Sequence, residues 1–367
     1  MHIPFCKSKC HYCDFCSFPK MGEEDMRAYC ETLRAQIVQK AAQLGDYEVD
    51  TVYFGGGTPT ALPSDLLCGL LARVKACFSV TADAEITAEC NPATADEKDL
   101  AAMRQAGFNR LSIGAQSLHD AELALLGRAH TAADFFATVE MARAAGFENI
   151  SADLMYGIPG QSRESFAASV RGICALGVRH VSAYALKIEQ GTPFYKMRKS
   201  LALPDEDVVA DMYEDCVAIL AQHGLARYEI SNFAKIGYES RHNLKYWEYG
   251  EYLGLGVAAH SFVGGERFAY EDVRAYMQGN PVATLADPNT PAESQDEFVM
   301  LGLRLEKGVD KAAFAARFGK EFDAVYGMRL APYISAGFVQ DSPARAHFTT
   351  KGFLVSNTIL SDILDFA

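Results

Sequence analysis

Four cysteines crowd into eleven residues near the start of the chain, at Cys6, Cys10, Cys13 and Cys16. This C-x3-C-x2-C-x2-C spacing gathers soft thiolate ligands on an irregular loop, which suits an iron–sulfur cluster or zinc. If all four thiolates bind one [4Fe–4S] cubane, the cluster is closed and can only pass electrons. If three bind, one iron keeps an open position. The other six cysteines are scattered along the chain, and we predict that they are small core residues.

An open iron can chelate the amino and carboxylate groups of S-adenosylmethionine (SAM). Electron transfer into SAM then breaks its sulfur–carbon bond and yields a 5′-deoxyadenosyl radical, while the protein positions the cofactor. The first three cysteines, followed by the aromatic-rich residues 14–18, resemble the radical SAM signature. The last three also follow a ferredoxin-like C-x2-C-x2-C pattern, so spacing alone leaves the ligation of Cys16 open. We predict that Cys16 is a nearby unligated thiol.

The elements that must position these thiols alternate along the chain. Apolar, β-branched segments predict strands at 50–54, 84–89, 110–115, 149–155 and 180–186, after a remnant of a first strand at Ile3. Amphipathic stretches predict helices at 26–44, 64–78, 96–106, 132–145 and 163–176. Strands that alternate with helices form parallel βαβ units. We therefore expect an α/β fold, a partial TIM-like (β/α)6 barrel.

Polar and glycine-rich motifs follow the ends of the predicted strands. Gly55, Gly56 and Gly57 come directly after one strand and let the backbone approach a ligand closely. Other polar residues at or just beyond later strand ends are Glu89, Gln116, Arg128 and Asp153. Each alone could be a capping or surface residue. Because the carboxyl-terminal rim of such a barrel carries its chemistry, together they could bind ribose hydroxyls and the SAM carboxylate.

The pattern changes after the barrel segment, which we predict to span residues 1–215. A helix at 206–223 leads into a connecting segment, 216–289, that is rich in aromatics and glycine. Residues 290–367 predict a small helical, winged-helix-like domain, with helices at 298–305, 311–318 and 322–331.

Composition excludes some classes of function. Hydrophobic residues make up 49% of the chain, enough for a large buried core. The net charge of −13 argues against a nucleic-acid partner, because phosphate binding needs a basic face. Neither a signal-like leader nor an apolar run long enough to cross a bilayer is visible. We expect a cytoplasmic protein, at most peripheral at the membrane and not integral to it.

Four longer motifs carry a family resemblance. Residues 2–6 (HIPFC), 54–60 (FGGGTPT), 109–117 (NRLSIGAQS) and 153–161 (DLMYGIPGQ) resemble the coproporphyrinogen III dehydrogenase branch of radical SAM proteins. Within that branch, the chain is most similar to the haem chaperone subfamily (HemW-type), whose C-terminal domain is HemN-like. The resemblance implies that Cys6, Cys10 and Cys13 bind the cluster, with Tyr12 beside it. It also implies SAM contacts from Gly56, Gly57, Thr58, Glu89, Gln116, Arg128 and Asp153.

Two features separate this subfamily from the decarboxylases that it resembles. The decarboxylases have a fourth cysteine two residues after the third, where this chain has Phe15. Residues 241–247 carry the HN-x2-YW pattern that the chaperone group associates with haem binding: His242, Asn243, Tyr246 and Trp247. A neutral imidazole can bind haem iron and aromatic rings can pack on a porphyrin, although a lone histidine is more often structural. His260 is a weaker candidate that could line the pocket.

The resemblance implies a haem carrier that binds the cluster, SAM and haem as cargo. Its partners would be respiratory haemoproteins that receive haem and an electron donor such as a flavodoxin; a monomer and a dimer both stay open. The alternative is an enzyme that decarboxylates the propionates of coproporphyrinogen III to vinyl groups, and no catalytic residue is assigned. A third class, a closed-cluster electron carrier or a structural zinc protein, requires Cys16 as a ligand. Because Met1 directly precedes His2, where the family has further residues including a tyrosine, we expect a short first strand.

Overall fold

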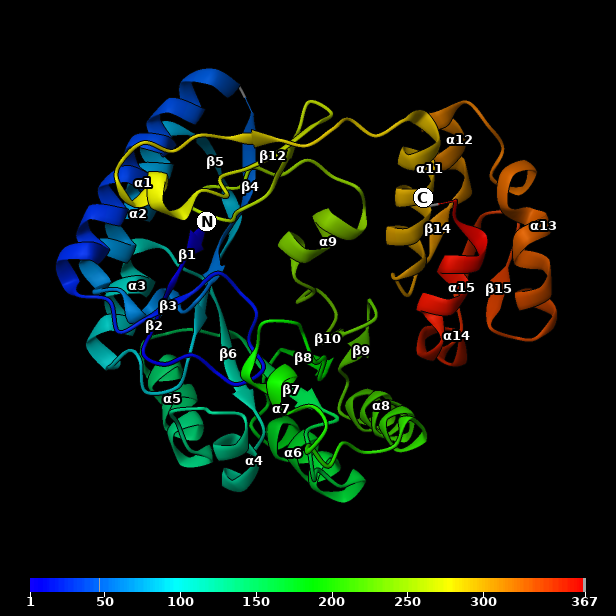
Figure 1. The fold of residues 1–367 in the computed structure, drawn as a ribbon, viewed down its shortest axis with the longest axis horizontal. Coiled ribbons are helices and arrows are strands. Elements are labelled where there is room, and N and C mark those ends of the chain that lie inside the picture. Colours follow the sequence, from blue (N-terminus) through cyan, green and yellow to red (C-terminus); the bar gives the residue numbers. More distant parts are fainter. Residues whose placement is uncertain (46, 366–367) are drawn as a thin grey trace.

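The computed structural model describes residues 1–45 and 47–365. An eight-stranded sheet with the order β1-β4-β5-β6-β7-β8-β10-β9 forms the frame of the larger part (Figure 1). Its first six strands are parallel neighbours. They are β1 (His2–Ile3), β4 (Glu48–Gly56), β5 (Ser79–Cys90), β6 (Arg110–Gln116), β7 (Asn149–Tyr156) and β8 (His180–Ala185). The predicted α/β fold with six successive parallel strands is thereby confirmed.

Helices connect these strands and cover the outside of the sheet (Figure 1). They are α1 (Glu23–Leu44), α2 (Ser64–Cys77), α3 (Glu97–Ala106), α5 (Ala132–Ala144) and α6 (Arg163–Ala175). Local chemistry sets their ends: the Asp96 side chain accepts from the N–H of Asp99 at the start of α3, and Gly107 ends it with φ +108°. A glycine adopts this left-handed conformation without the steric cost that a side chain would impose. One short helix, α4 (Asp120–Leu125), was not predicted.

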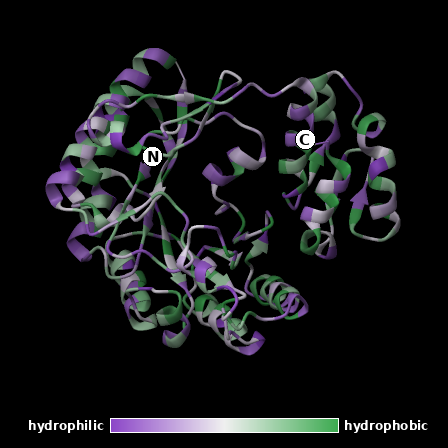
Figure 2. Cartoon of the chain, in the orientation of Figure 1, coloured by the Kyte–Doolittle hydropathy of each residue, from purple (hydrophilic) through white to green (hydrophobic). Residues whose placement is uncertain are grey.

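The core lies between the sheet and these helices. Phe54, Leu111 and Val181 of three different strands are fully buried, as are Leu70 and Phe166 of the covering helices. Each helix carries hydrophobic and hydrophilic residues together (Figure 2), as an amphipathic helix on a core must. Burial of these side chains contributes roughly 1.5–3 kcal/mol each, which holds the strand ends in register around the rim.

Two antiparallel strands extend the sheet beyond the predicted barrel. After α7 (Pro193–Met197) and α8 (Glu206–Gln222), strand β10 (Asn232–Ala234) pairs with β8, and strand β9 (Ala226–Arg227) pairs with β10. The predicted boundary at residue 215 falls inside α8. The segment that follows contains α9 (Arg241–Trp247), β11 (Ser261–Val263), β12 (Glu266–Ala269), α10 (Val273–Met277) and β13 (Thr284–Leu285).

The C-terminal part combines helices with a small antiparallel sheet. Its helices are α11 (Pro291–Leu303), α12 (Lys311–Phe318), α13 (Phe322–Ser335), α14 (Thr350–Leu354) and α15 (Ser356–Ile363). Its strands are β14 (Val309–Asp310), β15 (Val339–Asp341) and β16 (Arg345–Phe348). Figure 1 shows α9 between the large sheet and α11. Among the described helices, none is long and apolar enough to cross a membrane.

The sheet and the C-terminal part meet at Glu229, which forms an antiparallel bridge with Leu305. The Glu229 side chain is fully buried, and neither carboxylate oxygen has a hydrogen-bond partner of good geometry within the described residues. Burial raises the pKa of this carboxyl to about 7, and the nearby N–H groups of Ser231 and Asn232 offset only part of that effect. The ionised form is therefore costly in this place.

We predict that this carboxyl makes stability depend on pH. Its folded pKa lies above the ordinary value, so the folded state holds a proton that the unfolded chain has lost, and stability falls as pH rises from about 4.5 to about 7. Glu229→Gln removes that dependence. Thermal melts from about pH 5 to about pH 8 should therefore show the variant gaining on the wild type as pH rises, and an offset that stays constant with pH would contradict the assignment.

Candidate cluster and cofactor site

The cysteine loop lies between two very short parallel strands, β2 (Phe5–Cys6) and β3 (Phe18–Pro19). All ten cysteines lie within the described residues and are free thiols. Burial raises the pKa of Cys13, and the thiols of Cys10 and Cys6 lie near enough to raise it further. Cys16 instead packs against the hydrophobic core, and its backbone oxygen accepts a hydrogen bond from the His2 ring. The structure thus brings three of the four cysteines together.

A continuous polar network ties the first two of these thiols to the rim of the sheet. The Cys6 sulfur lies 3.5 Å from Thr58 Oγ1, which accepts a hydrogen bond of 2.6 Å from Asn91 Nδ2. Arg128 Nη2 donates to Asn91 Oδ1 at 2.6 Å, and Arg128 Nη1 donates to the Cys10 sulfur at 3.7 Å. The guanidinium therefore links the Cys10 sulfur to the Asn91 side chain. Tyr12 lies beside the same arginine, and burial raises its pKa.

The glycine triplet holds the strand that leads into this loop. The N–H groups of Gly55 and Gly57 donate to the carbonyls of Met1 and Ile3. A Cβ atom on Gly57 would lie 2.8 Å from the Phe5 carbonyl oxygen, and one on Gly56 would lie 2.7 Å from the His2 ring. A side chain at Gly57 would collide with the backbone that leads into the cysteine loop. One at Gly56 would displace the His2 ring and would be strained by the φ of +111°, so both positions require glycine.

Gln116 lies at the end of β6 in a strained conformation. Its φ of +63° is left-handed, and the pairing of β6 with β7 shifts register between Gly114 and Gln116. A Cβ atom on Gly114 would lie 2.9 Å from the Gln116 side-chain nitrogen. Left-handed non-glycine residues cost free energy and concentrate at functional sites. The half-exposed Gln116 amide is therefore held over the rim at a cost in stability.

Two carboxyl groups lie along the inside of the sheet. Glu89 accepts hydrogen bonds from Tyr53 Oη at 2.8 Å and from the N–H of Gly56 at 3.0 Å. Burial raises its pKa to about 7, and the nearby charge of Asp153 adds to that effect. Asp153 accepts from Ser112 Oγ at 3.0 Å, and burial raises its pKa too. Each carboxylate has lone pairs left for donors on a ligand, such as hydroxyl or ammonium groups.

These residues fit a [4Fe–4S] cluster with SAM beside it. Arg128 Nε is buried and has no hydrogen-bond partner within the described residues, so a donor remains for a ligand carboxylate. Within the same residues, no three histidine, cysteine or acidic side chains converge on a single metal ion. The three thiolates that hold a cubane each bind a different iron and therefore stand further apart than the ligands of one ion. We expect Arg128, Glu89 and Asp153 to face such a ligand.

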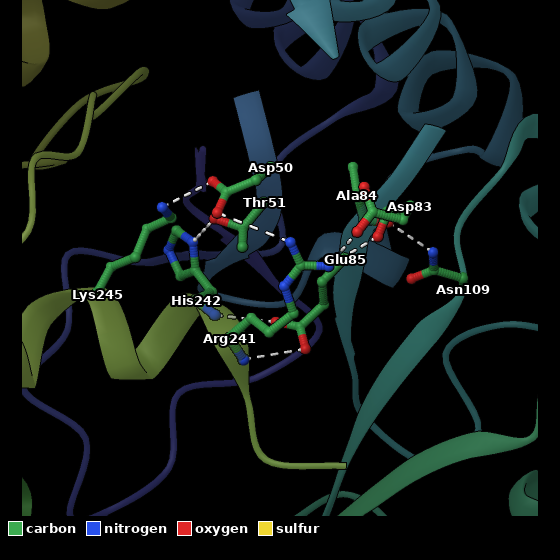
Figure 3. Close-up of polar contacts among 9 residues, drawn as sticks. All are labelled: Asp50, Thr51, Asp83, Ala84, Glu85, Asn109, Arg241, His242 and Lys245. Atoms are coloured by element: carbon green, nitrogen blue, oxygen red, sulfur yellow. Dashed lines mark hydrogen bonds and ion pairs between the residues drawn. The ribbon is translucent and has the colours of Figure 1, made fainter. Parts of the chain in front are cut away.

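The helix with the predicted haem motif is fixed against residues 50–51 of β4 and 83–85 of β5 (Figure 3). Glu85 accepts hydrogen bonds from the N–H groups of Arg241 and His242, the first two residues of α9. A carboxylate at a helix N-terminus is stabilising because it meets unpaired N–H groups and the positive end of the helix dipole. Asp50 forms an ion pair of 2.7 Å with Lys245, one turn further along. Figure 3 shows this carboxylate between Lys245 and Arg241.

His242 is held on three sides. Its Nδ1 lies 2.9 Å from Thr51 Oγ1 and its Nε2 lies 2.9 Å from Tyr246 Oη, while its ring stacks on Tyr53 at 5.0 Å between centroids. Burial lowers the pKa of this imidazole to about 3, so the ring is neutral at pH 7. The hydroxyls of Thr51 and Tyr246 thus occupy both nitrogens of this neutral ring.

The four residues of the predicted haem motif do not share one face of α9. Tyr246 packs with His242 and is 37% exposed. Trp247 instead lies beside Arg304, directly after α11, with the guanidinium 5.9 Å from its ring. The backbone N–H of Asn243 donates to Ser240 Oγ and caps the helix. His260 is exposed on a separate loop.

A pocket runs along β4 beside His242. It encloses about 840 Å³ of space, including the part open to solvent. Residues 48–53 of β4 line it together with Leu44, Leu253, Leu255 and Lys245. It follows the edge of β4 that β1 leaves uncovered, since β1 pairs only with Gly55 and Gly56.

Sequence reasoning assigned no role to four residues that organise these sites: Thr51, Tyr53, Glu85 and Asn91. Thr51 and Tyr53 alternate along β4 and thus share the face that looks into the barrel, so strand periodicity could have identified them. Asn91 lies two residues after Glu89 in the same motif. Glu85 contacts a helix that begins at residue 241, and no local signal reveals such a partner.

The geometry and the comparisons identify a class. The Radical SAM superfamily profile matches residues 1–172, and the HemN C-terminal domain profile matches residues 289–355. The structure resembles that of Escherichia coli coproporphyrinogen III oxidase (HemN), a radical SAM enzyme, with a TM-score of 0.87 and 25% identity over 100% of this chain and 89% of that one. The chain belongs to the radical SAM superfamily.

Full-length relatives define the family within that class. The chain is 35% identical to the Heme chaperone HemW of Bacillus subtilis, over 99% of this chain and 98% of that protein. It is 34% identical to the Heme chaperone HemW of Escherichia coli, over 98% of this chain and 96% of that protein. This chain therefore belongs to the HemW haem chaperone family.

We predict that substitution distinguishes the three clustered thiols from the fourth. After anaerobic reconstitution, Cys6→Ser, Cys10→Ser and Cys13→Ser should each lose most of the bound iron and sulfide, because each removes one ligand of the cubane. Cys16→Ser is the matched control and should retain the iron content of the wild type. Loss of the cluster in the Cys16 variant, with its fold intact by circular dichroism, would indicate a four-thiolate site.

Proposed function

We propose that this chain is a haem carrier that binds haem at His242 and passes it to respiratory haemoproteins. A [4Fe–4S] cluster at Cys6, Cys10 and Cys13, with SAM beside it, would support that transfer. The proposal is supported by the relatives named heme chaperones, which match this chain over almost their entire length. It places the protein in the cytoplasm, at most peripheral at the membrane, with a donor such as a flavodoxin to reduce the cluster.

The rim residues would bind SAM in this proposal. When bound, the cluster would supply an open iron for the amino and carboxylate groups of SAM and the electron that breaks its sulfur–carbon bond. Arg128 would donate its free Nε–H to the carboxylate, while Glu89 and Asp153 would accept from the hydroxyl groups or from the N–H of the iron-bound amine. The backbone of Gly56, Gly57 and Thr58 and the amide of Gln116 would complete the contacts.

The single observation that carries the haem assignment is the neutral, oriented imidazole of His242. Only the unprotonated ring can bind iron, and the low pKa of His242 keeps it in that form. Thr51 fixes Nδ1, so Nε2 would be the iron ligand. The Tyr246 hydroxyl now occupies Nε2 and would have to turn away, which its position at the surface allows. After that turn Tyr246 would flank the porphyrin, whereas Trp247 packs beside Arg304, away from this face of α9.

The similarity to coproporphyrinogen III oxidase favours a second candidate, the decarboxylation of coproporphyrinogen propionates. Phe15, 60% exposed, stands where the decarboxylases have their fourth cysteine. This departure from the decarboxylase pattern counts against the enzyme. Incubation of the reconstituted protein with SAM, dithionite and coproporphyrinogen III should therefore yield no vinyl product, whereas vinyl product would establish the enzyme instead.

Haem titration of three variants tests the carrier. His242→Ala should weaken haem binding roughly tenfold or more, because it removes the iron ligand. Tyr246→Phe keeps the ring but removes the hydroxyl that competes for Nε2, so haem affinity should rise about two- to tenfold, the worth of one hydrogen bond. His260→Ala, which removes an exposed imidazole elsewhere, is the control and should bind as the wild type. Wild-type affinity in the His242 variant would contradict the site.

A further inference from the structure

One side chain contacts both proposed sites. Tyr53 presents its ring to His242 at 5.0 Å between centroids, with the two planes only 15° apart. Its hydroxyl reaches the other way and donates to Glu89 Oε1 at 2.8 Å. The second oxygen of Glu89 accepts from the N–H of Gly56 in the glycine triplet. A continuous chain of contacts therefore runs from the cofactor rim to the imidazole.

His242 is held so closely that a change in this series of contacts must affect its ring. Thr51 holds Nδ1 and Figure 3 shows both residues where α9 crosses β4. Glu85 fixes the backbone of the same residue. The ring of Tyr53 forms the floor on which His242 stacks, so a shift of Tyr53 must move the ring or leave a gap beneath it.

We propose that Tyr53 is a positioning residue that couples the two sites, so that SAM at Glu89 tightens haem binding at His242. This inference rests on the proposed function, because it assumes that both ligands bind where we place them. It adds a direction of regulation: the carrier takes up haem more tightly when its cofactor site is filled.

The sign of the coupling follows from charge. SAM carries a sulfonium cation, and a cation beside Glu89 favours the ionised form of this carboxyl. An ionised carboxylate accepts the Tyr53 hydroxyl more strongly than a neutral carboxyl does. The stronger hydrogen bond fixes the ring beneath His242, and the conformational cost of ordering that ring no longer falls on haem binding. By thermodynamic reciprocity, haem must tighten SAM binding by the same factor.

The test measures coupling and not affinity alone. The haem dissociation constant of the cluster-reconstituted protein is determined with and without saturating SAM, in the absence of reductant so that SAM is not consumed. The wild type should bind haem about fivefold or more tightly with SAM. Tyr53→Phe keeps the ring and removes only the hydroxyl, so each ligand should still bind while the ratio of the two constants falls close to one.

Two further variants keep the test decisive. Thr51→Val removes the other partner of His242 but does not touch Glu89, so haem affinity should change while the ratio persists. Glu89→Gln acts at the opposite end of the same hydrogen bond and should abolish the ratio even if Tyr53→Phe fails to fold. A wild-type ratio of one, or an unchanged ratio in both Tyr53→Phe and Glu89→Gln, would overturn the inference. If the wild type bound no haem at all, the proposed function would fail and this inference with it.

Discussion

The cofactor site depends on the contacts that the Arg128 guanidinium makes. The cysteine loop has only two two-residue strands of its own, and an irregular segment of this kind loses much conformational entropy when it is ordered. Arg128 offsets that cost because it reaches the Cys10 sulfur, the Asn91 side chain and the Gly114 carbonyl at once. Through Asn91 and Thr58 the same network reaches Cys6. Residues at the ends of β4, β5 and β6 thus hold Cys6 and Cys10, two of the predicted cluster ligands, through this network.

A second constraint acts further back along the same strands. Asp50 near the start of β4 and the acidic residues Asp83 and Glu85 of β5 bind the N-terminus and the basic side chains of α9, and thereby hold His242 against the inner face of β4. The cofactor rim and the haem motif are therefore fixed to one pair of strands, a few residues apart. Glu89 and Tyr53 lie between the two sites, so the same pair of strands connects the predicted iron–sulfur site to the haem motif.

Much of the fold could be predicted from sequence because the signals are local. Apolar segments gave every long parallel strand, and the glycine after α3 marked its end as expected. The unligated state of Cys16 stays a prediction, because its packing against the core does not test whether it binds a cluster. The antiparallel strands β9 and β10 were missed because they are short, and β10 pairs with β8, a strand far back in the chain. The attachment of α9 to Glu85 was missed because it joins residues far apart in the chain, and Trp247 lies away from His242 because it packs beside Arg304.

The central claim is that three thiolates hold the cluster and leave one iron open to SAM. Electron–nuclear double resonance on the reduced protein, with SAM labelled with nitrogen-15 in its amino group, tests this most directly. We predict a hyperfine coupling between the label and the cluster, unchanged in Cys16→Ser, because the unique iron would bind the amino nitrogen. A reduced cluster that shows no coupling to the label, in a protein that retains full iron content, would contradict the account.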